Sequence, residues 1–535
     1  MGPEANAGLI RVLEKRIEEG SGDTIKLKRD RNSLLNISTR VPPEILGYIF
    51  VWSLDWENCR YFDGIQEGFY NFLLVCYHWF DVASHTPELW SFWGNTLQDW
   101  KKRHHRSGAT PLDLVLVGDE SDPGVLFEES LKNAVRTRVI QDTMRQVHLT
   151  SNDGELLASI ISSLTPDDGS GQNDNIESIV LENCGHPVVN ISDFFARSRL
   201  SKLCWLDLGG NLWISSWDHL ASRATLLTTL TLNISGPLSS PTLTTSRLLS
   251  ILISNPNLQE LTLANITILD DVDGSTFKVQ LRSLKKLNLT GEFCHIFGLL
   301  HRLILPEMLD RLGLAVSNST VEDISQSLAP YMRDYFRRDP RFQGRLGVSS
   351  SSYDDYISIA VGVVHTQTTA PRLKLPRVLL TVLTNQPPDV LEQLLTNLIA
   401  LVPQDHVVFF DADINAMVPE ELFFAMPNIE TLHLSNMLLS EGFLQPDPAG
   451  PNANTKLFPS LRLLRLEDVD YLNDEDWSLL KTYLTHQTSD GQAISLEVIG
   501  SFPSGPPEMV NGIRGLVKEF AHHQGVVVED EEDEE

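Results

Sequence analysis

The sequence predicts an α/β fold in which helices at the amino end are followed by a curved parallel sheet with outer helices. Three observations predict it. The 535 residues are 42% hydrophobic and 21% charged, close to the average of globular proteins. Apolar residues recur with helical spacing between residues 41 and 90. Beyond residue 110, a shorter pattern of leucines and isoleucines repeats along the chain.

The charge balance limits the partners that the chain can bind. The 42 Lys and Arg against 71 Asp and Glu give a net charge of -29, which repels phosphate backbones and anionic membranes. No apolar run approaches the roughly 20 residues that a membrane span needs, and Met1–Gly20 is amphipathic rather than a signal peptide. We expect a cytoplasmic and/or nuclear protein with no membrane and no nucleic-acid partner.

The reactive side chains predict no enzyme, cofactor or metal. The sequence has no Gly-x-Ser-x-Gly, P-loop, Gly-x-Gly-x-x-Gly or His-Glu-x-x-His motif. The cysteines form no Cys-x-x-Cys pair, and we interpret them as buried small hydrophobic residues. The five are Cys59, Cys76, Cys184, Cys204 and Cys294.

The first segment, residues 1–37, is predicted to be a helix and a basic linker. Leu9–Leu35 has one apolar stripe, interrupted at Gly20–Gly22. The basic stretch Lys26–Arg31 is expected to lie on a solvated or partner-facing helix, and it could also serve as a nuclear address.

Residues 38–93 predict two short helices and an anchor. Proline begins the first, Val41–Phe50, and the second is expected over Phe72–Ala83. Pro87 breaks the pattern, and Leu89–Trp90 follows.

These residues resemble the F-box of fungal F-box/leucine-rich-repeat proteins. The resemblance rests on Pro42-Pro43-Glu44-Ile45-Leu46, Leu74-Val75-Cys76-x-x-Trp79-x-x-Val82-Ala83 and Thr86-Pro87-x-Leu89-Trp90. It implies docking onto a Skp-type adaptor and, through the adaptor, onto a cullin ubiquitin ligase. A helical cap on an unrelated domain is the alternative.

The two helices carry more apolar area than so small a unit can bury, which predicts an adaptor-binding surface. Its expected members are Pro42, Pro43, Ile45, Leu46, Ile49, Leu74, Val75 and Trp79.

Residues 94–525 predict a leucine-rich-repeat solenoid. Ile176-x-x-Ile179-x-Leu181-x-x-Cys184 and Leu203-x-x-Leu206-x-Leu208-x-x-Asn211 fit the template, with Cys or Asn expected to satisfy backbone groups in the turn. Looser copies start at Leu227, Leu258, Leu284, Leu309, Ile429 and Leu461. The first six starts are 24 to 31 residues apart, near the repeat's usual period of about 20 to 29. Earlier strands are expected at Leu112–Leu116 and Val147–Leu149.

An irregular insertion is predicted near residues 315–426. Tyr356–Val363 and Val378–Leu383 are expected to be antiparallel strands, Val390–Leu401 a helix and His406–Asp411 a further strand. Ile513–Phe520 is expected to help cap the array, and the acidic tail, 526–535, to be disordered.

Strand residues between the second and third leucines should point away from the core. Together with flanking outward positions, they suggest a surface suited to a protein or peptide target, although they could equally be ordinary solvated strand residues. The candidate target-binding residues are Trp205, Asp207, Glu260, Lys286, Arg311, His433 and Arg465.

Three other clusters are weaker signals. We interpret the pairs His104–His105 and His522–His523 as exposed histidines, and Lys101–Arg106 as a solvated helix end. Asp411 and Asp413 are a weak hint of a metal site.

Three functions remain open from the sequence. The first is a substrate-recognition subunit of a Skp-cullin-F-box type ubiquitin ligase. The second is a leucine-rich-repeat scaffold or inhibitor that binds a protein without any ligase. A nuclear protein associated with nucleic acid is the third, and the net charge argues against it.

Overall fold

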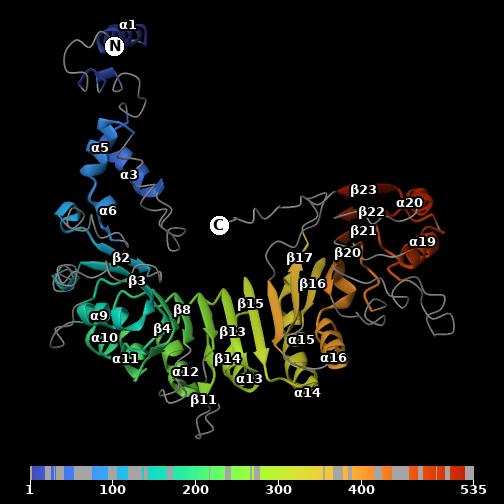
Figure 1. Cartoon of the computed structure of the whole chain (residues 1–535). Helices are drawn as coiled ribbons and strands as arrows, with labels where there is room; N and C mark the ends of the chain where they lie inside the picture. Colours follow the sequence, from blue (N-terminus) through green and yellow to red (C-terminus); the bar gives the residue numbers. More distant parts are fainter. Residues whose placement is uncertain are drawn as a thin grey trace. The chain divides into compact units, whose positions relative to one another are not determined.

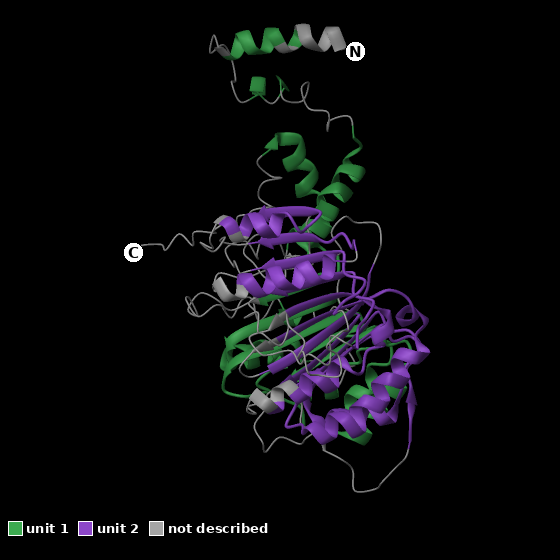
Figure 2. Cartoon of the chain, turned by 90° about the vertical axis from the view of Figure 1, so that its right-hand side faces the viewer, with its two compact units in different colours: residues 1–258 green, residues 259–535 purple. Residues whose placement is uncertain are grey.

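A computed structural model shows a mixed α/β chain that divides into two compact units, Met1–Leu258 and Gln259–Glu535 (Figure 2). The structure describes residues 3–18, 26–28, 30–31, 41–53, 75–93, 105–117, 135–137, 143–165, 173–215, 217–234, 243–265, 268–269, 277–353, 356–364, 377–383, 388–414, 425–435, 457–467, 474–489, 491–499 and 507–523. The predicted domain boundary at residue 93 falls inside the first unit, and the acidic tail lies outside the described residues. In the part of the chain so described, no helix is long and apolar enough to cross a membrane.

The first unit consists of short helices followed by a parallel sheet (Figure 1). The helices before the sheet are α1 (Pro3–Glu18), α3 (Pro43–Ser53), α5 (Tyr77–Ser84) and α6 (Pro87–Trp90). The strands are β1 (Phe92–Trp93), β2 (Leu112–Val117), β3 (Met144–Asp153), β4 (Ser178–His186), β6 (Trp205–Gly210) and β8 (Thr229–Ile234), parallel and adjacent in this order. Between them lie α9 (Gly154–Leu164), α10 (Ser192–Arg197) and α11 (Asp218–Arg223), with α12 (Thr245–Ser254) after β8. The strands expected near residues 112 and 147 are confirmed.

The second unit contains a longer sheet, parallel except at one strand. Its strands are β10 (Glu260–Ala264), β13 (Lys286–Glu292), β15 (Arg311–Ser317), β16 (Leu346–Tyr353), β17 (Tyr356–Val363), β18 (Val378–Leu383), β19 (Val407–Ile414), β20 (Thr431–Ser435), β21 (Leu463–Glu467), β22 (Ser495–Ile499) and β23 (Glu519–His523). Its main helices are α13 (Phe293–Arg302), α15 (Ala329–Arg338), α16 (Pro388–Ile399), α19 (Asp474–Thr488) and α20 (Pro507–Arg514).

The insertion changes the spatial order of the strands in the second unit. From β15 the sheet continues through β18, β17 and β16 to β19, and β17 is antiparallel to both of its neighbours. The predicted antiparallel pair at 356–363 and 378–383 is therefore confirmed. The helix expected from Val390 and the strand expected from His406 are also present, as α16 and β19.

Leucine spacing explains why the strands and helices pack as they do. In β10, β20, β21 and β22 every second side chain is buried and those between are half-buried. The buried side chains, such as Leu261 and Leu287, face the helices, and α13 and α16 lie on the same side of the sheet (Figure 1). The other side is called the open face below. It consists of the alternate strand residues, which point away from these helices.

The turn after β4 corrects one detail of the predicted repeat. Asn211 satisfies a turn carbonyl as expected, because its amide donates to the Gly185 carbonyl at 2.9 Å. In the preceding copy the ninth residue, Cys184, is exposed, and it is Asn183 that donates to the carbonyls of Pro187 and Asn211 at 2.9 Å each. A primary amide offers two donors and a good acceptor, whereas a thiol is a weak donor. The buried role expected of the cysteines is wrong for Cys184 and Cys294, which are exposed, while Cys76 and Cys204 are half-buried and Cys59 lies outside the described residues.

Candidate functional site

The helices α3, α5 and α6 enclose a small core of their own. Buried members of that core include Leu46, Phe50 and Trp90. The indole N–H of Trp90 donates to the Ala83 carbonyl at 2.7 Å, and the guanidinium of Arg106 lies 4.2 Å above the Trp90 ring. Arg106 belongs to the basic cluster that the sequence analysis interpreted as a solvated helix end. It instead packs on the helical core.

The opposite side of α3 is also apolar, and it is exposed. Ile45, Tyr48, Ile49 and Trp52 recur at helical spacing, with 49%, 66%, 50% and 84% of their surface exposed. On α5 and just before it, Val75, Tyr77 and Phe80 are 50%, 53% and 40% exposed. We call these seven residues the helical docking face. Exposed apolar clusters of this kind are typical of interaction surfaces, because removing them from water lowers the free energy.

The structure exposes some of the predicted adaptor-binding residues and buries others. Pro42, Pro43, Ile45, Ile49 and Val75 are exposed.

Leu46 lies in the core and not on the exposed surface expected for it. It is only 3% exposed, because it fills the core between α3, α5 and α6. Trp79 is half-buried and packs against Phe50 with ring centroids 4.8 Å apart. Leu74 lies outside the described residues. The sequence analysis did not include four exposed members of the helical docking face, Tyr48, Trp52, Tyr77 and Phe80. On α3, the helical spacing of residues 45, 48, 49 and 52 would have indicated that they share one face.

The open face of each sheet holds the predicted target-binding residues. Trp205 and Asp207 are half-buried on β6 in the first unit, and Asp207 is in register with Val180 and Thr231. In the second unit, Glu260, Lys286 and Arg311 are in register on β10, β13 and β15. The ammonium of Lys286 lies 2.7 Å from the Glu260 carboxylate. The outward direction predicted for these strand positions agrees with the alternating burial.

A polar network extends over β16, β19, β20, β21 and β22 on the open face of the second unit. His433 Nδ1 lies 3.0 Å from Asp411 Oδ1, and the Ser349 hydroxyl donates to Asp411 Oδ2 at 3.1 Å. His433 Nε2 lies 2.8 Å from Glu467 Oε2, an ion-pair distance without hydrogen-bond geometry. We call this set, with the Arg465–Glu497 pair described next, the carboxylate cluster.

Arg465 completes the carboxylate cluster. Its Nε and one terminal nitrogen both donate to Glu497 Oε2, at 2.8 and 2.6 Å. The cluster thus contains three carboxylates, one guanidinium and one imidazole, all partly buried. Asp411, suggested by the sequence as a metal hint, serves as an ion-pair partner, and the side chain of Asp413 lies outside the described set.

The carboxylate cluster is expected to make the stability of the second unit depend on pH. Burial alone would lower the pKa of His433, but the hydrogen bond to Asp411 and the charges of Asp411 and Glu467 raise it above its ordinary value. A histidine whose pKa is higher in the folded than in the unfolded chain stabilises the fold. This contribution is fully present below the pKa of about 6.5 in the unfolded chain, and it is lost as the pH rises through the pKa in the folded chain. We expect the parent chain to exceed a His433→Gln variant in thermal stability by more at about pH 6 than at about pH 8.5. Equal differences at both pH values would contradict this charge-linked role.

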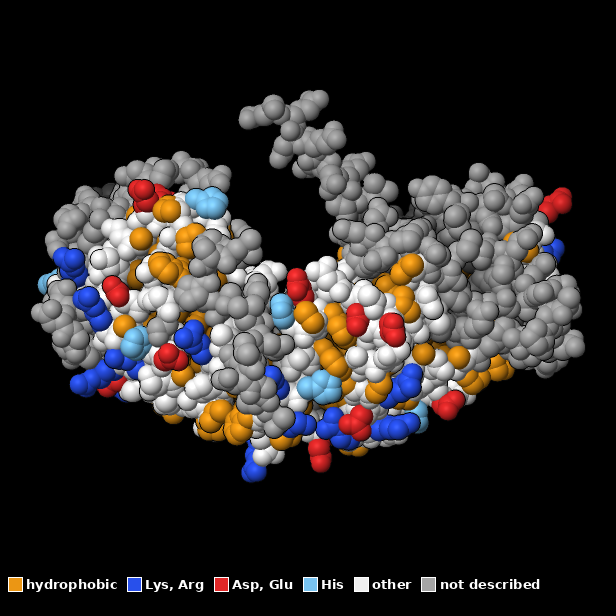
Figure 3. Space-filling model, turned by 90° about the horizontal axis from the view of Figure 1, so that it is seen from below, with side chains coloured by type: hydrophobic (Ala, Val, Ile, Leu, Met, Phe, Trp, Pro, Cys, Tyr) orange, Lys and Arg blue, Asp and Glu red, His pale blue; other side chains and the backbone are white. Residues whose placement is uncertain are grey.

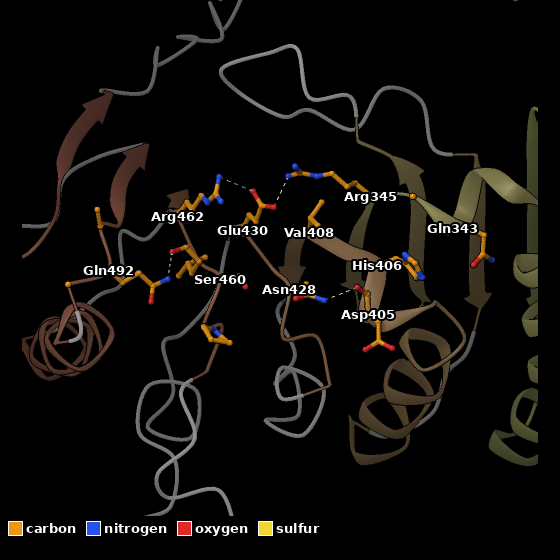
Figure 4. Close-up of a pocket in the computed structure, with 15 residues that line it drawn as sticks. Gln343, Arg345, Asp405, His406, Val408, Asn428, Glu430, Ser460, Arg462 and Gln492 are labelled. Carbon is orange, nitrogen blue, oxygen red and sulfur yellow. Dashed lines mark hydrogen bonds and ion pairs between the residues drawn. The ribbon is translucent and has the colours of Figure 1, made fainter.

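A polar pocket of about 980 Å³ lies at the amino ends of β16, β19, β20, β21 and β22 (Figure 4). Arg345 and Arg462 approach Glu430 from opposite sides, at 2.9 and 3.6 Å. Asn428 donates to the Asp405 carbonyl at 2.9 Å. The two guanidiniums share the Glu430 carboxylate, and Asp405 adds a second carboxylate to the lining, so the positive and negative charges of the pocket balance.

Two further arrangements bear on chemistry. The Ser349 hydroxyl donates to Asp411 rather than to His433, so these three residues do not form the nucleophile–base pair of a serine hydrolase.

Glu292, Cys294 and His295 place ligand atoms within 4.8 Å of one another at the start of α13. A cation there would face the positive end of the helix dipole, which opposes binding.

The face drawn in Figure 3 bears charged side chains of both signs, interspersed among apolar and uncharged ones.

Searches of known proteins add nothing to these observations, because no family model and no curated protein matches the chain.

Proposed function

We propose that the chain is the substrate-recognition subunit of a Skp-cullin-F-box type ubiquitin ligase. In this proposal residues 38–93 act as an F-box that docks on a Skp-type adaptor, and residues 94–525 form a leucine-rich-repeat solenoid that holds a protein target. The chain supplies no catalytic groups of its own. It accelerates ubiquitin transfer by keeping the target close to the enzyme that other subunits recruit.

The helical docking face is the observation that carries the proposal. Its aromatic and branched side chains lie outside a unit whose core is already complete, since Leu46, Phe50 and Trp90 are 1% to 3% exposed. Large aromatic residues on a small exposed surface are typical of the energetic centre of a protein interface. The F-box resemblance in the sequence supplies the class of partner.

Affinity capture from cells in which the proteasome is blocked tests this function. We expect the tagged chain to bring down a Skp-type adaptor, a cullin and ubiquitin-modified proteins, and a chain lacking residues 38–93 to lose the first two. The alternative of a leucine-rich-repeat scaffold or inhibitor predicts bound proteins without adaptor or cullin. Capture of the same adaptor and cullin by the shortened chain would contradict the assignment of residues 38–93.

A further inference from the structure

The open face of the second unit separates positive from negative charge. Rows of outward side chains can be followed across its sheet through the strand register. One row contains Glu260, Lys286 and Arg311, and Arg377 comes next, because Leu312 is paired with Val378. Lys286 and Arg311 are exposed and Arg377 is half-buried. We call Lys286, Arg311 and Arg377 the basic row. Together with the carboxylate of Glu260, the row has a net charge of two positive units.

The next row runs along the sheet to the opposite charge. Asn288 and Gly313 are followed by Leu379, Ala360 and Ser349. Ser349 is in register with Asp411, and the row then continues through the strands of the carboxylate cluster. Its members there are Asp411, His433, Arg465 and Glu497.

No charged side chain lies between the two ends among the described positions of these rows. On β18, β17 and β16 the outward residues are hydroxyl-bearing, small or apolar. They include Leu379, Thr381, Ala360, Ser358, Ser349 and Ser351. The carboxylate cluster sums to two negative units with neutral His433 and to one with His433 protonated.

The carboxylate cluster retains acceptors for a ligand. Both donors of Arg465 go to the same oxygen of Glu497, and His433 approaches one oxygen of Glu467. Among the described residues, no hydrogen bond or ion pair involves the second oxygen, Oε1, of either carboxylate. Glu467 and Glu497 are diagonal neighbours, since Glu467 is in register with Ile499 and Arg465 with Glu497. Diagonal residues on one sheet face are about 7–8 Å apart, within reach of one guanidinium.

We propose that this open face binds an extended protein segment that has acidic side chains toward one end and basic side chains toward the other. The acidic end would contact the basic row, and the basic end would contact Glu467 and Glu497. This inference deepens the target-binding part of the proposed function and names the chemistry of the target; it does not depend on the adaptor.

The spacing of the strands sets the length of the segment. From β15, which holds Arg311, there are six strand steps to β21 and seven to β22, which hold Glu467 and Glu497; at about 4.8 Å per step this gives about 29–34 Å. An extended chain rises by about 3.3 Å per residue, so about nine to ten residues separate the two charged ends. Charge pairs of this kind determine partner choice and orientation more than total affinity.

Two synthetic peptides of identical composition provide the test. One has three glutamates, eight uncharged Ser and Gly residues and three arginines in blocks, and the other has the same residues with the charges alternating. Fluorescence anisotropy with the full chain at low salt is expected to show at least about tenfold tighter binding of the block peptide, a preference that weakens as salt is added. Equal affinities, no binding of the block peptide at millimolar concentration, or equal binding of a peptide with only the arginines would each overturn the proposal.

Charge reversal at each end identifies the surface. We expect Glu467→Lys with Glu497→Lys, or Arg311→Glu with Arg377→Glu, to weaken the block peptide at least about tenfold. Combining all four substitutions should restore binding, because the peptide can turn end for end. If circular dichroism shows that Lys at 467 and 497 prevents folding, Glu467→Gln with Glu497→Gln takes its place. Unchanged binding by the folded variants would overturn the proposal.

Adaptor binding by the same preparations separates this result from the proposed function. A chain that binds the adaptor and fails to distinguish the peptides refutes only the target chemistry. A chain that distinguishes the peptides and binds no adaptor refutes only the ligase assignment.

Discussion

Replacing Ile49 and Trp52 with aspartate is expected to abolish binding to a Skp-type adaptor while the chain stays folded. Both side chains are exposed on α3, at 50% and 84%, so the substitutions create no cavity in the core. Central apolar residues of an interface contribute about 2 kcal/mol or more each, and a buried unpaired carboxylate adds a further penalty. The expected loss in affinity is therefore at least about a thousandfold, measured by isothermal titration calorimetry.

A matched control comes from α1 in the same chain. Leu9 and Val12 are also exposed apolar helix residues, at 42% and 54%, and they lie outside the helical docking face. Leu9→Asp with Val12→Asp should leave adaptor affinity within about twofold, because surface substitutions away from an interface have small effects. An equal loss in both double variants would mean that added charge, rather than the docking face, explains the result.

Replacing Arg341 with methionine should cause the largest loss of stability in the second unit. The Asp339 side chain is fully buried, and Arg341 contacts both of its carboxylate oxygens, at 2.6 to 3.1 Å, and also donates to the Leu309 carbonyl at 2.5 Å. Removing one partner of a buried ion pair leaves an uncompensated charge and costs about 3–5 kcal/mol. Thermal denaturation, with hydrogen exchange to locate the change near β15 and β16, measures the loss.

The neighbouring pair of Arg338 and Asp334 is the control. It has a similar separation of 3.0 Å, but its side chains are 42% and 68% exposed. Exposed ion pairs contribute about 0–1 kcal/mol, so Arg338→Met should change stability little. The double variant Asp339→Asn with Arg341→Met should recover part of the loss, because it removes the unpaired charge. Similar losses for Arg338→Met and Arg341→Met would show that burial does not set the cost.

The repeated strands could be predicted because their spacing is a direct consequence of burial. Leucines such as Leu206 and Leu287 must alternate to reach the core, and the alternation is local in the sequence. Two of the missed strands have a clear physical reason. β16 contains the run Ser349–Ser352, whose polar side chains hide the alternation of Leu346 and Val348. β22 matches no full copy of the template.

Long-range pairing and the choice of buried face could not be predicted from local patterns. Ser349 lies next to Asp411, 62 residues later in the chain, only because β16 pairs with β19 on the side away from β17 and β18. On α3, apolar residues surround the helix, so spacing alone did not show whether Leu46 or Ile45 faces inward. That choice is made by α5 and α6, whose Ala83 and Leu89 pack beside Leu46.

Titration of the purified full chain with a purified Skp-type adaptor tests the central claim most directly. We expect a one-to-one complex that co-elutes in size-exclusion chromatography and binds with submicromolar affinity, with a negative heat-capacity change from burial of the helical docking face. The Ile49→Asp, Trp52→Asp variant supplies the baseline. A well-folded parent chain that shows neither heat nor co-elution with adaptor at tens of micromolar would contradict the account.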